Sequence, residues 1–173
     1  GFGTTLHLAR RDFWPQAEFI AVEPDLSMQP YLAALGCRQV PGLEDVAPQS
    51  CDLIVASHVL EHFQATEIED VLTRLRSLLR PGGRLLAEVP NSDFSANPEV
   101  AGHSHEPHLL FFSRGAFGRL VESCGFRVDF LATVGSPRRR RLSERLAGYL
   151  RRLAGRPPAE YGGNRAALRL LAG

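Results

Sequence analysis

The sequence feature that most constrains the fold is the stretch from Ala17 to Asp25, AEFIAVEPD. Phe19 to Val22 form an apolar run that ends abruptly at Glu23. A short unbroken apolar run is typical of a strand buried on both faces, as in a parallel sheet. A carboxylate at the carboxyl end of such a strand lies where open α/β sheets bind ligands. It can accept both hydroxyl hydrogen bonds of a ribose. A solvated strand-end carboxylate is the simpler alternative for Glu23.

Predicted helices and strands alternate along the rest of the chain. Further strands are expected at residues 37–40, 51–56, 84–89 and 126–134, and helices at 4–11, about 27–35, 66–79 and after Ser113. Thr66 and Glu69 predict a capping box for the clearest helix, and Pro81-Gly82-Gly83 predicts its end. The alternation predicts an α/β fold with a doubly wound, mostly parallel, Rossmann-like sheet and helices on both faces. Because no strand precedes the first glycines, we expect the first strand to be missing through truncation at the N-terminus.

Length and composition indicate an ordinary globular chain of 173 residues with 44% hydrophobic and 23% charged residues. The charge is unevenly divided. Residues 136–173 hold ten Arg and two Glu, a charge of +8, so residues 1–135 must carry −7 to give the net +1. We therefore predict a domain at 1–135 and an Arg-rich amphipathic helical tail or insertion at 136–173. Within that region, 165–171 reads as a short helix or a degenerate strand.

The charge distribution also bears on partners and location. An acidic body argues against a DNA groove across the fold. The Arg-rich tail can pack on the acidic body, which we favour, rest on an anionic membrane, or contact RNA phosphates. Three scattered cysteines indicate a reducing compartment, and no apolar run approaches the ~18 residues of a membrane span. Together these observations favour a cytoplasmic location.

The first glycines predict a nucleoside cofactor without a pyrophosphate. Gly1 and Gly3 let the backbone approach a ligand before the next helix. The dinucleotide fingerprint requires a further glycine three residues after the second, and Leu6 stands there. The chain also has no Lys, so the Tyr-x-x-x-Lys pair of many nicotinamide enzymes is absent. An NAD(P)-dependent Rossmann oxidoreductase is therefore the disfavoured alternative.

Several motifs, in this order and spacing, resemble those of class I S-adenosylmethionine-dependent methyltransferases, over about residues 1–134. The group it resembles most includes ubiquinone-biosynthesis O-methyltransferases. The motifs are Gly1-Phe2-Gly3, Val22-Glu23-Pro24-Asp25, CDLIVASHVLEH at 51–62, Leu79 to Gly83 with Glu88 to Asn91, and His108 to Ser113 with Gly125-Phe126. The resemblance implies a seven-stranded sheet with its first strand lost upstream. We find no convincing last strand after Val134.

The resemblance implies S-adenosyl-L-methionine as cofactor and assigns residues to its parts. Gly1 and Gly3 belong to the glycine loop, and Glu23 with Pro24 to the ribose site. Leu43 and Glu44 take the place of the adenine contacts, although an exposed turn carboxylate is the favoured role of Glu44. The methionyl contacts fall on Ala56, Ser57 and His58, mainly through the backbone, and His62 closes the cofactor floor.

Two histidine groups admit a metal as an alternative. His58 to His62 match the H-x-x-E-H pattern of inverted zinc peptidases, but they lie in a turn-like segment, so we favour a packed His62. His103, His105 and His108 can likewise bind a divalent metal, yet a solvated loop is favoured for the first two. We predict no metal. His108, which matches the subgroup motif, is the candidate base near the acceptor.

The sequence therefore predicts methyl transfer to a small-molecule acceptor, with a hydroxyl oxygen favoured over nitrogen or carbon. Alignment of the acceptor with the methyl carbon and removal of one proton suffice for this chemistry. A non-catalytic methyltransferase-like binding module is the remaining alternative, but the presence of Gly1, Gly3 and Glu23 argues against it.

Overall fold

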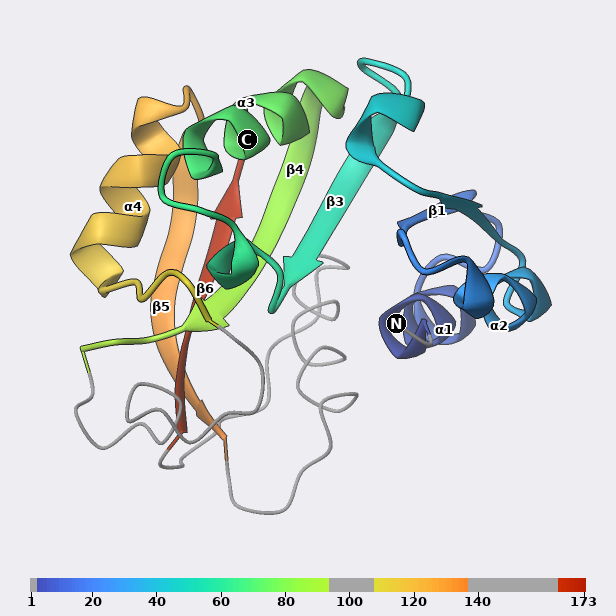
Figure 1. Cartoon of the computed structure of the whole chain (residues 1–173), viewed down its shortest axis with the longest axis horizontal. Helices are drawn as coiled ribbons and strands as arrows, with labels where there is room; N and C mark the ends of the chain where they lie inside the picture. Colours follow the sequence, from blue (N-terminus) through green and yellow to red (C-terminus); the bar gives the residue numbers. More distant parts are fainter. Residues whose placement is uncertain (1–2, 94–107, 137–164) are drawn as a thin grey trace. The chain divides into compact units, whose positions relative to one another are not determined.

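The computed structural model describes residues 3–93, 108–136 and 165–173, which form two compact units (Figure 1). The first unit holds the residues up to Val46. The second begins at Ala47 and includes the last residues of the chain. The predicted Arg-rich helix between 137 and 164, with its membrane or RNA contacts, lies outside the described residues, as do Gly1, His103 and His105.

The first unit contains a parallel strand pair with short helices. Its elements in order are α1 (Thr4–Asp12), β1 (Phe19–Val22), η1 (Leu26–Met28), α2 (Gln29–Ala34), β2 (Cys37–Val40) and η2 (Leu43–Asp45). β1 and β2 are parallel, with Phe19 opposite Cys37 and Val22 opposite Val40. β1 occupies the apolar run from Phe19 to Val22, and β2 occupies the segment 37–40 where a strand was expected.

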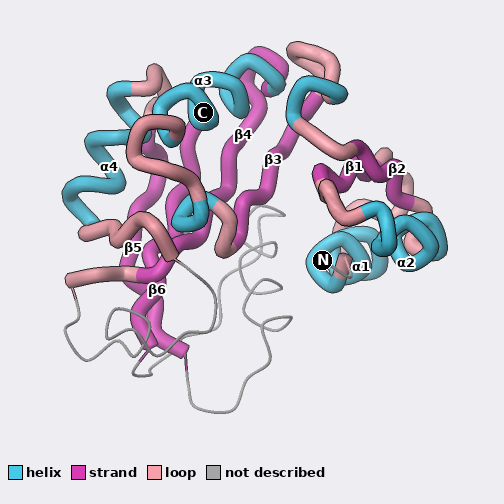
Figure 2. Tube along the Cα trace, in the orientation of Figure 1, coloured by secondary structure: helices cyan, strands magenta, loops and turns pink. Residues whose placement is uncertain are grey.

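The second unit contains a four-stranded sheet (Figure 2). Its elements are β3 (Cys51–Ser57), η3 (Leu60–His62), α3 (Ile68–Leu78), β4 (Leu79–Pro90), α4 (Arg114–Ser123), β5 (Val128–Ser136) and β6 (Arg165–Ala172). The strand order is β3-β4-β6-β5. β3 is parallel to β4, and β6 is antiparallel to it. The predicted α/β class with a mostly parallel arrangement is confirmed.

The core of the second unit forms because its helices are amphipathic and its central strand is apolar on both faces. α3 packs on β4, and α4 packs on β6. Fully or nearly fully buried side chains come from both layers: Leu72, Leu75, Leu78, Phe117, Val121, Leu85, Val89, Leu168 and Leu170. Every residue of β4 from Leu85 to Pro90 is buried, as expected for a central strand. The carboxyl end of this strand is thus fixed by packing on all sides.

The helix predicted at 66–79 is shorter than expected at its start. α3 begins at Ile68, and its N-terminus has no side-chain cap, so the capping box predicted for Thr66 and Glu69 is wrong. Instead the Glu67 carboxylate accepts a hydrogen bond from the Gln64 backbone N–H at 3.1 Å. Residues 64–67 therefore form a turn in place of the first turn of the predicted helix.

The sheet also differs from expectation in β4. Pro81-Gly82-Gly83 follow the helix, as expected, but they belong to the start of β4. Cys51 pairs with Leu79, whereas Leu53 pairs with Arg84, so the register shifts across the three residues. Gly82 has a φ of 81°, which accommodates this irregularity.

The helix expected after Ser113 is α4, and Ser113 itself is its N-cap. The Ser113 hydroxyl accepts a hydrogen bond from the Ala116 N–H at 3.2 Å and so caps α4. Gly125 follows the helix with a φ of 84°, a conformation that side chains other than Gly rarely adopt.

The last strand of the sheet is β6, although the sequence analysis grouped it with the tail. Residues 165–171 were open to a helical or a strand interpretation, and the structure places them in a strand. β6 lies between β4 and β5, and the buried side chains of Leu168, Leu170 and Ala172 hold it there. The C-terminal residues therefore belong to the fold itself. Among the described residues, no helix is long and apolar enough to cross a membrane.

Candidate functional site

The glycine predicted to approach the cofactor precedes α1 in the first unit. Gly3 has a φ of 73°, and a Cβ there would lie 2.8 Å from the Leu35 side chain and 3.0 Å from that of Leu32. The backbone conformation therefore favours glycine, whereas the two leucine side chains could shift to admit a Cβ.

Glu23 follows β1 directly, where the sequence places it. Its N–H donates to the Val40 carbonyl at 2.9 Å, which extends the pairing of β1 with β2. Its carboxylate Oε1 accepts the Asp25 N–H at 3.0 Å, and Gln39 Nε2 donates to the Glu23 carbonyl at 2.7 Å. Pro24 is exposed within this turn. The strand end thus holds the carboxylate in a hydrogen-bonded turn.

The residues predicted for adenine lie in η2, after β2. The Glu44 side chain is exposed and that of Leu43 is half-buried. This exposure agrees with the simpler interpretation of Glu44 as a turn carboxylate.

The predicted methionyl contacts lie at the end of β3 in the second unit. Ala56 is buried, and Ser57 pairs with Glu88 of β4. The next residue, His58, has a φ of 54°, and its N–H donates to the Glu88 carbonyl at 2.9 Å. A non-glycine residue with positive φ is uncommon, and such residues cluster at functional sites. The chain here turns sharply away from the sheet into η3.

A buried network of four charged groups surrounds this turn. His58 Nδ1 lies 3.2 Å from Glu61 Oε1, and its Nε2 lies 3.5 Å from Glu88 Oε1. The Arg169 guanidinium pairs with Glu88 across neighbouring strands, where the two residues are in register. Glu61, Glu88 and Arg169 are 0%, 4% and 7% exposed. Buried charges of this kind persist only when they are paired.

The network shifts the ionisation of two of its members. The hydrogen bond to Glu61 and then the one to Glu88 raise the pKa of His58 to about 10, against the opposing effect of burial. Burial alone would raise the pKa of Glu88, but the hydrogen bond from His58 and the charge of Arg169 outweigh it and lower that pKa to about 2. His58 is therefore a cation at neutral pH, and Glu88 is an anion.

The low pKa of Glu88 predicts that the free energy of unfolding falls at acid pH, and we call this fall the acid limb. Because the carboxyl has a pKa of about 2 in the folded protein and 4.5 otherwise, its contribution is complete above pH 4.5 and is lost as the pH falls towards 2. The loss from this group should be about 3 kcal/mol. Urea denaturation at successive pH values measures it. Glu88→Gln should flatten this limb, whereas the exposed Glu122→Gln should leave it unchanged, and equal limbs in both variants would contradict the assignment.

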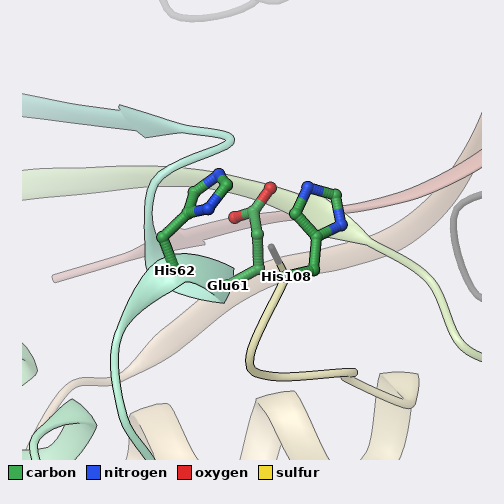
Figure 3. A group of neighbouring side chains, drawn as sticks. All are labelled: Glu61, His62 and His108. Atoms are coloured by element: carbon green, nitrogen blue, oxygen red, sulfur yellow. The ribbon is translucent and has the colours of Figure 1, made fainter. Parts of the chain in front are cut away.

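Two histidines and a carboxylate gather beside this network (Figure 3). Glu61 and His62 come from η3, and His108 comes from the segment before α4. One ligand atom of each lies within 4.8 Å of those of the other two. The His62 and His108 rings meet edge to face, with centroids 4.9 Å apart. The structure thus brings together the predicted floor residue and the predicted base.

Backbone hydrogen bonds fix this arrangement. The Leu109 and Leu110 N–H groups both donate to the Glu61 carbonyl, at 2.8 and 3.0 Å. They tie the segment that carries His108 to η3. The side chain of Asn91, which follows β4, donates to Thr133 Oγ1 at 3.0 Å and accepts the Asp93 N–H at 2.9 Å. Asn91 therefore organises the loop backbone.

Sequence reasoning did not select Glu61, Glu88 or Arg169 as site residues. Glu88 carried a signal, because it is a charged residue within the apolar strand segment at 84–89. Glu61 stands inside the H-x-x-E-H pattern, where it was considered only for zinc hydrolysis. Arg169 could not be paired with Glu88 without knowing that β6 joins the sheet.

Residues 1–130 match the family model described as a methyltransferase domain. The chain belongs to this family. This match includes the glycine loop, the Glu23 turn and the cluster of Glu61, His62 and His108. It identifies S-adenosylmethionine as the cofactor. The prediction of a class I methyltransferase is confirmed.

A curated relative matches a short part of this methyltransferase domain. It is a highly reducing polyketide synthase from Talaromyces stipitatus, 43% identical over 49 residues. The match covers 28% of the chain and 2% of the synthase.

Solved structures show the same fold. A SAM-dependent methyltransferase from Archaeoglobus fulgidus has a TM-score of 0.70 at 15% identity, with 100% of this chain and 82% of that one covered. A 1,6-didemethyltoxoflavin-N1-methyltransferase from Burkholderia thailandensis, with bound 1,6-didemethyltoxoflavin and S-adenosylhomocysteine, has a TM-score of 0.54 at 15% identity. There 88% of this chain and 58% of the other are covered.

Proposed function

We propose that the protein transfers the methyl group of S-adenosylmethionine to a hydroxyl oxygen of a small molecule. The supporting observation is the cluster of Glu61, His62 and His108 beyond the carboxyl ends of β3 and β4. Open α/β sheets bind ligands at this edge. Two imidazoles and a carboxylate supply groups that can take or stabilise the loss of the hydroxyl proton near neutral pH.

The reaction balances with groups of this kind. The acceptor oxygen forms a bond to the methyl carbon while the carbon–sulfur bond breaks. The electron pair of the broken bond neutralises the sulfonium and leaves S-adenosylhomocysteine. The hydroxyl proton is transferred to a base of the cluster. His108 is the candidate for this base.

Apolar residues beside the cluster favour an organic acceptor. Val59, Leu109 and Phe111 are 44%, 46% and 49% exposed, and each lies within three residues of a cluster member in the chain. Exposed large apolar side chains near polar catalytic groups are typical of small-molecule sites.

The absence of disulfides, with Cys37, Cys51 and Cys124 all free, supports a reducing, cytoplasmic location as part of the proposal.

The test is methyl transfer from methyl-labelled S-adenosylmethionine to a panel of small aromatic and aliphatic hydroxyl compounds, each paired with its amine analogue. We expect label in hydroxyl compounds. His108→Gln should lower kcat by about 10²- to 10⁴-fold, whereas the exposed His7→Gln should leave it within a factor of about two. Label in amines alone would overturn the oxygen assignment. An absence of transfer to every compound would favour a binding module.

A further inference from the structure

We propose that Glu61, His62 and His108 bind one divalent transition-metal ion of the Zn²⁺ or Co²⁺ type. In Figure 3 their side chains extend in the same direction from their backbones, with the carboxylate beside both imidazoles. The three ligand atoms lie within 4.8 Å of one another. This inference departs from the prediction that the protein has no metal.

Unsatisfied buried atoms point to a missing ligand at this place. Glu61 is 0% exposed, and its Oε2 has no hydrogen-bond partner, nor has the buried Nδ1 of His108. A buried carboxylate oxygen or imidazole nitrogen without a partner costs free energy. The two atoms belong to the same cluster, so one cation contacting both residues would compensate them together.

The donor set fits the proposed class of ion. Two imidazoles with one carboxylate suit first-row transition metals, whereas Mg²⁺ and Ca²⁺ prefer oxygen ligands alone. Zn–N and Zn–O bonds of about 2.0–2.2 Å place tetrahedral ligand atoms roughly 3.3 Å apart. The ligand atoms of Glu61, His62 and His108 lie within 4.8 Å of one another, so small side-chain rotations would bring them to this separation. Three protein ligands leave a further coordination position open.

The surroundings hold the carboxylate in place. His58 Nδ1 is 3.2 Å from Glu61 Oε1, which leaves Oε2 as the oxygen for the ion. Glu88 and Arg169 in turn position His58. Hydrogen-bonded partners of this kind orient metal ligands and are needed for affinity.

A bound ion would deepen the proposed function, on which this step rests. An acceptor hydroxyl at the open position would release its proton to solvent water more readily, because a metal ion lowers the pKa of a bound oxygen. His108 would then act as a ligand rather than as the base. The acceptors would be molecules whose hydroxyl oxygen can coordinate the ion.

The test is titration of Co²⁺ into chelator-treated protein, followed by the visible absorption of the bound ion. We expect one equivalent to bind. Glu61→Gln and His108→Gln should each weaken binding at least 10-fold, while Glu67→Gln and His7→Gln, at exposed positions, should not. No saturable binding, or unchanged binding in Glu61→Gln, would overturn the site.

X-ray absorption of the Zn²⁺-loaded wild-type protein gives a second readout that needs no variant to fold. We expect two imidazole nitrogens and an oxygen around the ion. Sulfur ligands would instead indicate the cysteines and overturn the assignment. Because neither readout uses cofactor or acceptor, failure of the metal site and failure of methyl transfer are distinguishable.

Discussion

Replacement of Arg169 by Met is expected to lower the free energy of unfolding of the second unit by about 3 to 5 kcal/mol. Arg169 is 7% exposed and pairs with Glu88, which is 4% exposed. The methionine side chain fills similar space but removes the guanidinium from the Glu88 carboxylate, which keeps its contact with His58. Most of the loss therefore comes from a buried charge that has lost its principal counter-ion. Hydrogen exchange of the β4 and β6 amides measures the effect in this unit alone.

The matched controls separate charge from packing. Glu88→Met combined with Arg169→Met should recover much of the stability, because replacing both members of a buried ion pair with apolar residues is often near neutral. Arg127→Met should change it by no more than about 1 kcal/mol, because the Arg127 side chain is 73% exposed in its pair with Asp129. A loss below about 1 kcal/mol in Arg169→Met would contradict the role assigned to the buried pair.

Replacement of Glu23 by Gln is expected to weaken binding of S-adenosylhomocysteine by about 10- to 100-fold. The carboxylate is predicted to accept the two ribose hydroxyls, and charge-assisted hydrogen bonds contribute about 1.5 to 3 kcal/mol each. Glutamine keeps the shape and an acceptor oxygen for the Asp25 N–H, so the turn after β1 should persist. Isothermal titration calorimetry measures the change. Equal affinity in Glu23→Gln and in the exposed control Glu18→Gln would contradict the ribose assignment.

Much of the fold could be predicted because the decisive signals are local. Apolar runs bounded by turn residues gave β1 and β3, and the Ser113 cap depends on neighbours in sequence. The start of α3 was wrong because the local turn at Gln64 to Glu67 competes with the capping box. β6 was not assigned because its sequence also suits a helix, and its place is decided by pairing with β4, far away in the chain.

The candidate site was less predictable because long-range contacts build it. His62 and His108 were each selected singly, but nothing in the sequence shows that their rings meet. The Glu61 side chain is buried only in the folded protein. Its backbone carbonyl accepts hydrogen bonds from Leu109 and Leu110, which join segments nearly fifty residues apart in the chain. Arg169 meets Glu88 only after the final strand enters the sheet. Patterns along the chain identify such groups one at a time and do not show how they combine.

Calorimetric titration of the wild-type protein with S-adenosylhomocysteine, and separately with NAD, tests the central claim most directly. A methyltransferase domain with the glycine loop at Gly3 and the acid at Glu23 should bind S-adenosylhomocysteine at micromolar concentration and should not bind NAD. Binding of NAD instead would contradict the assignment of the cofactor. Binding of neither would contradict a catalytic role and favour a non-catalytic module.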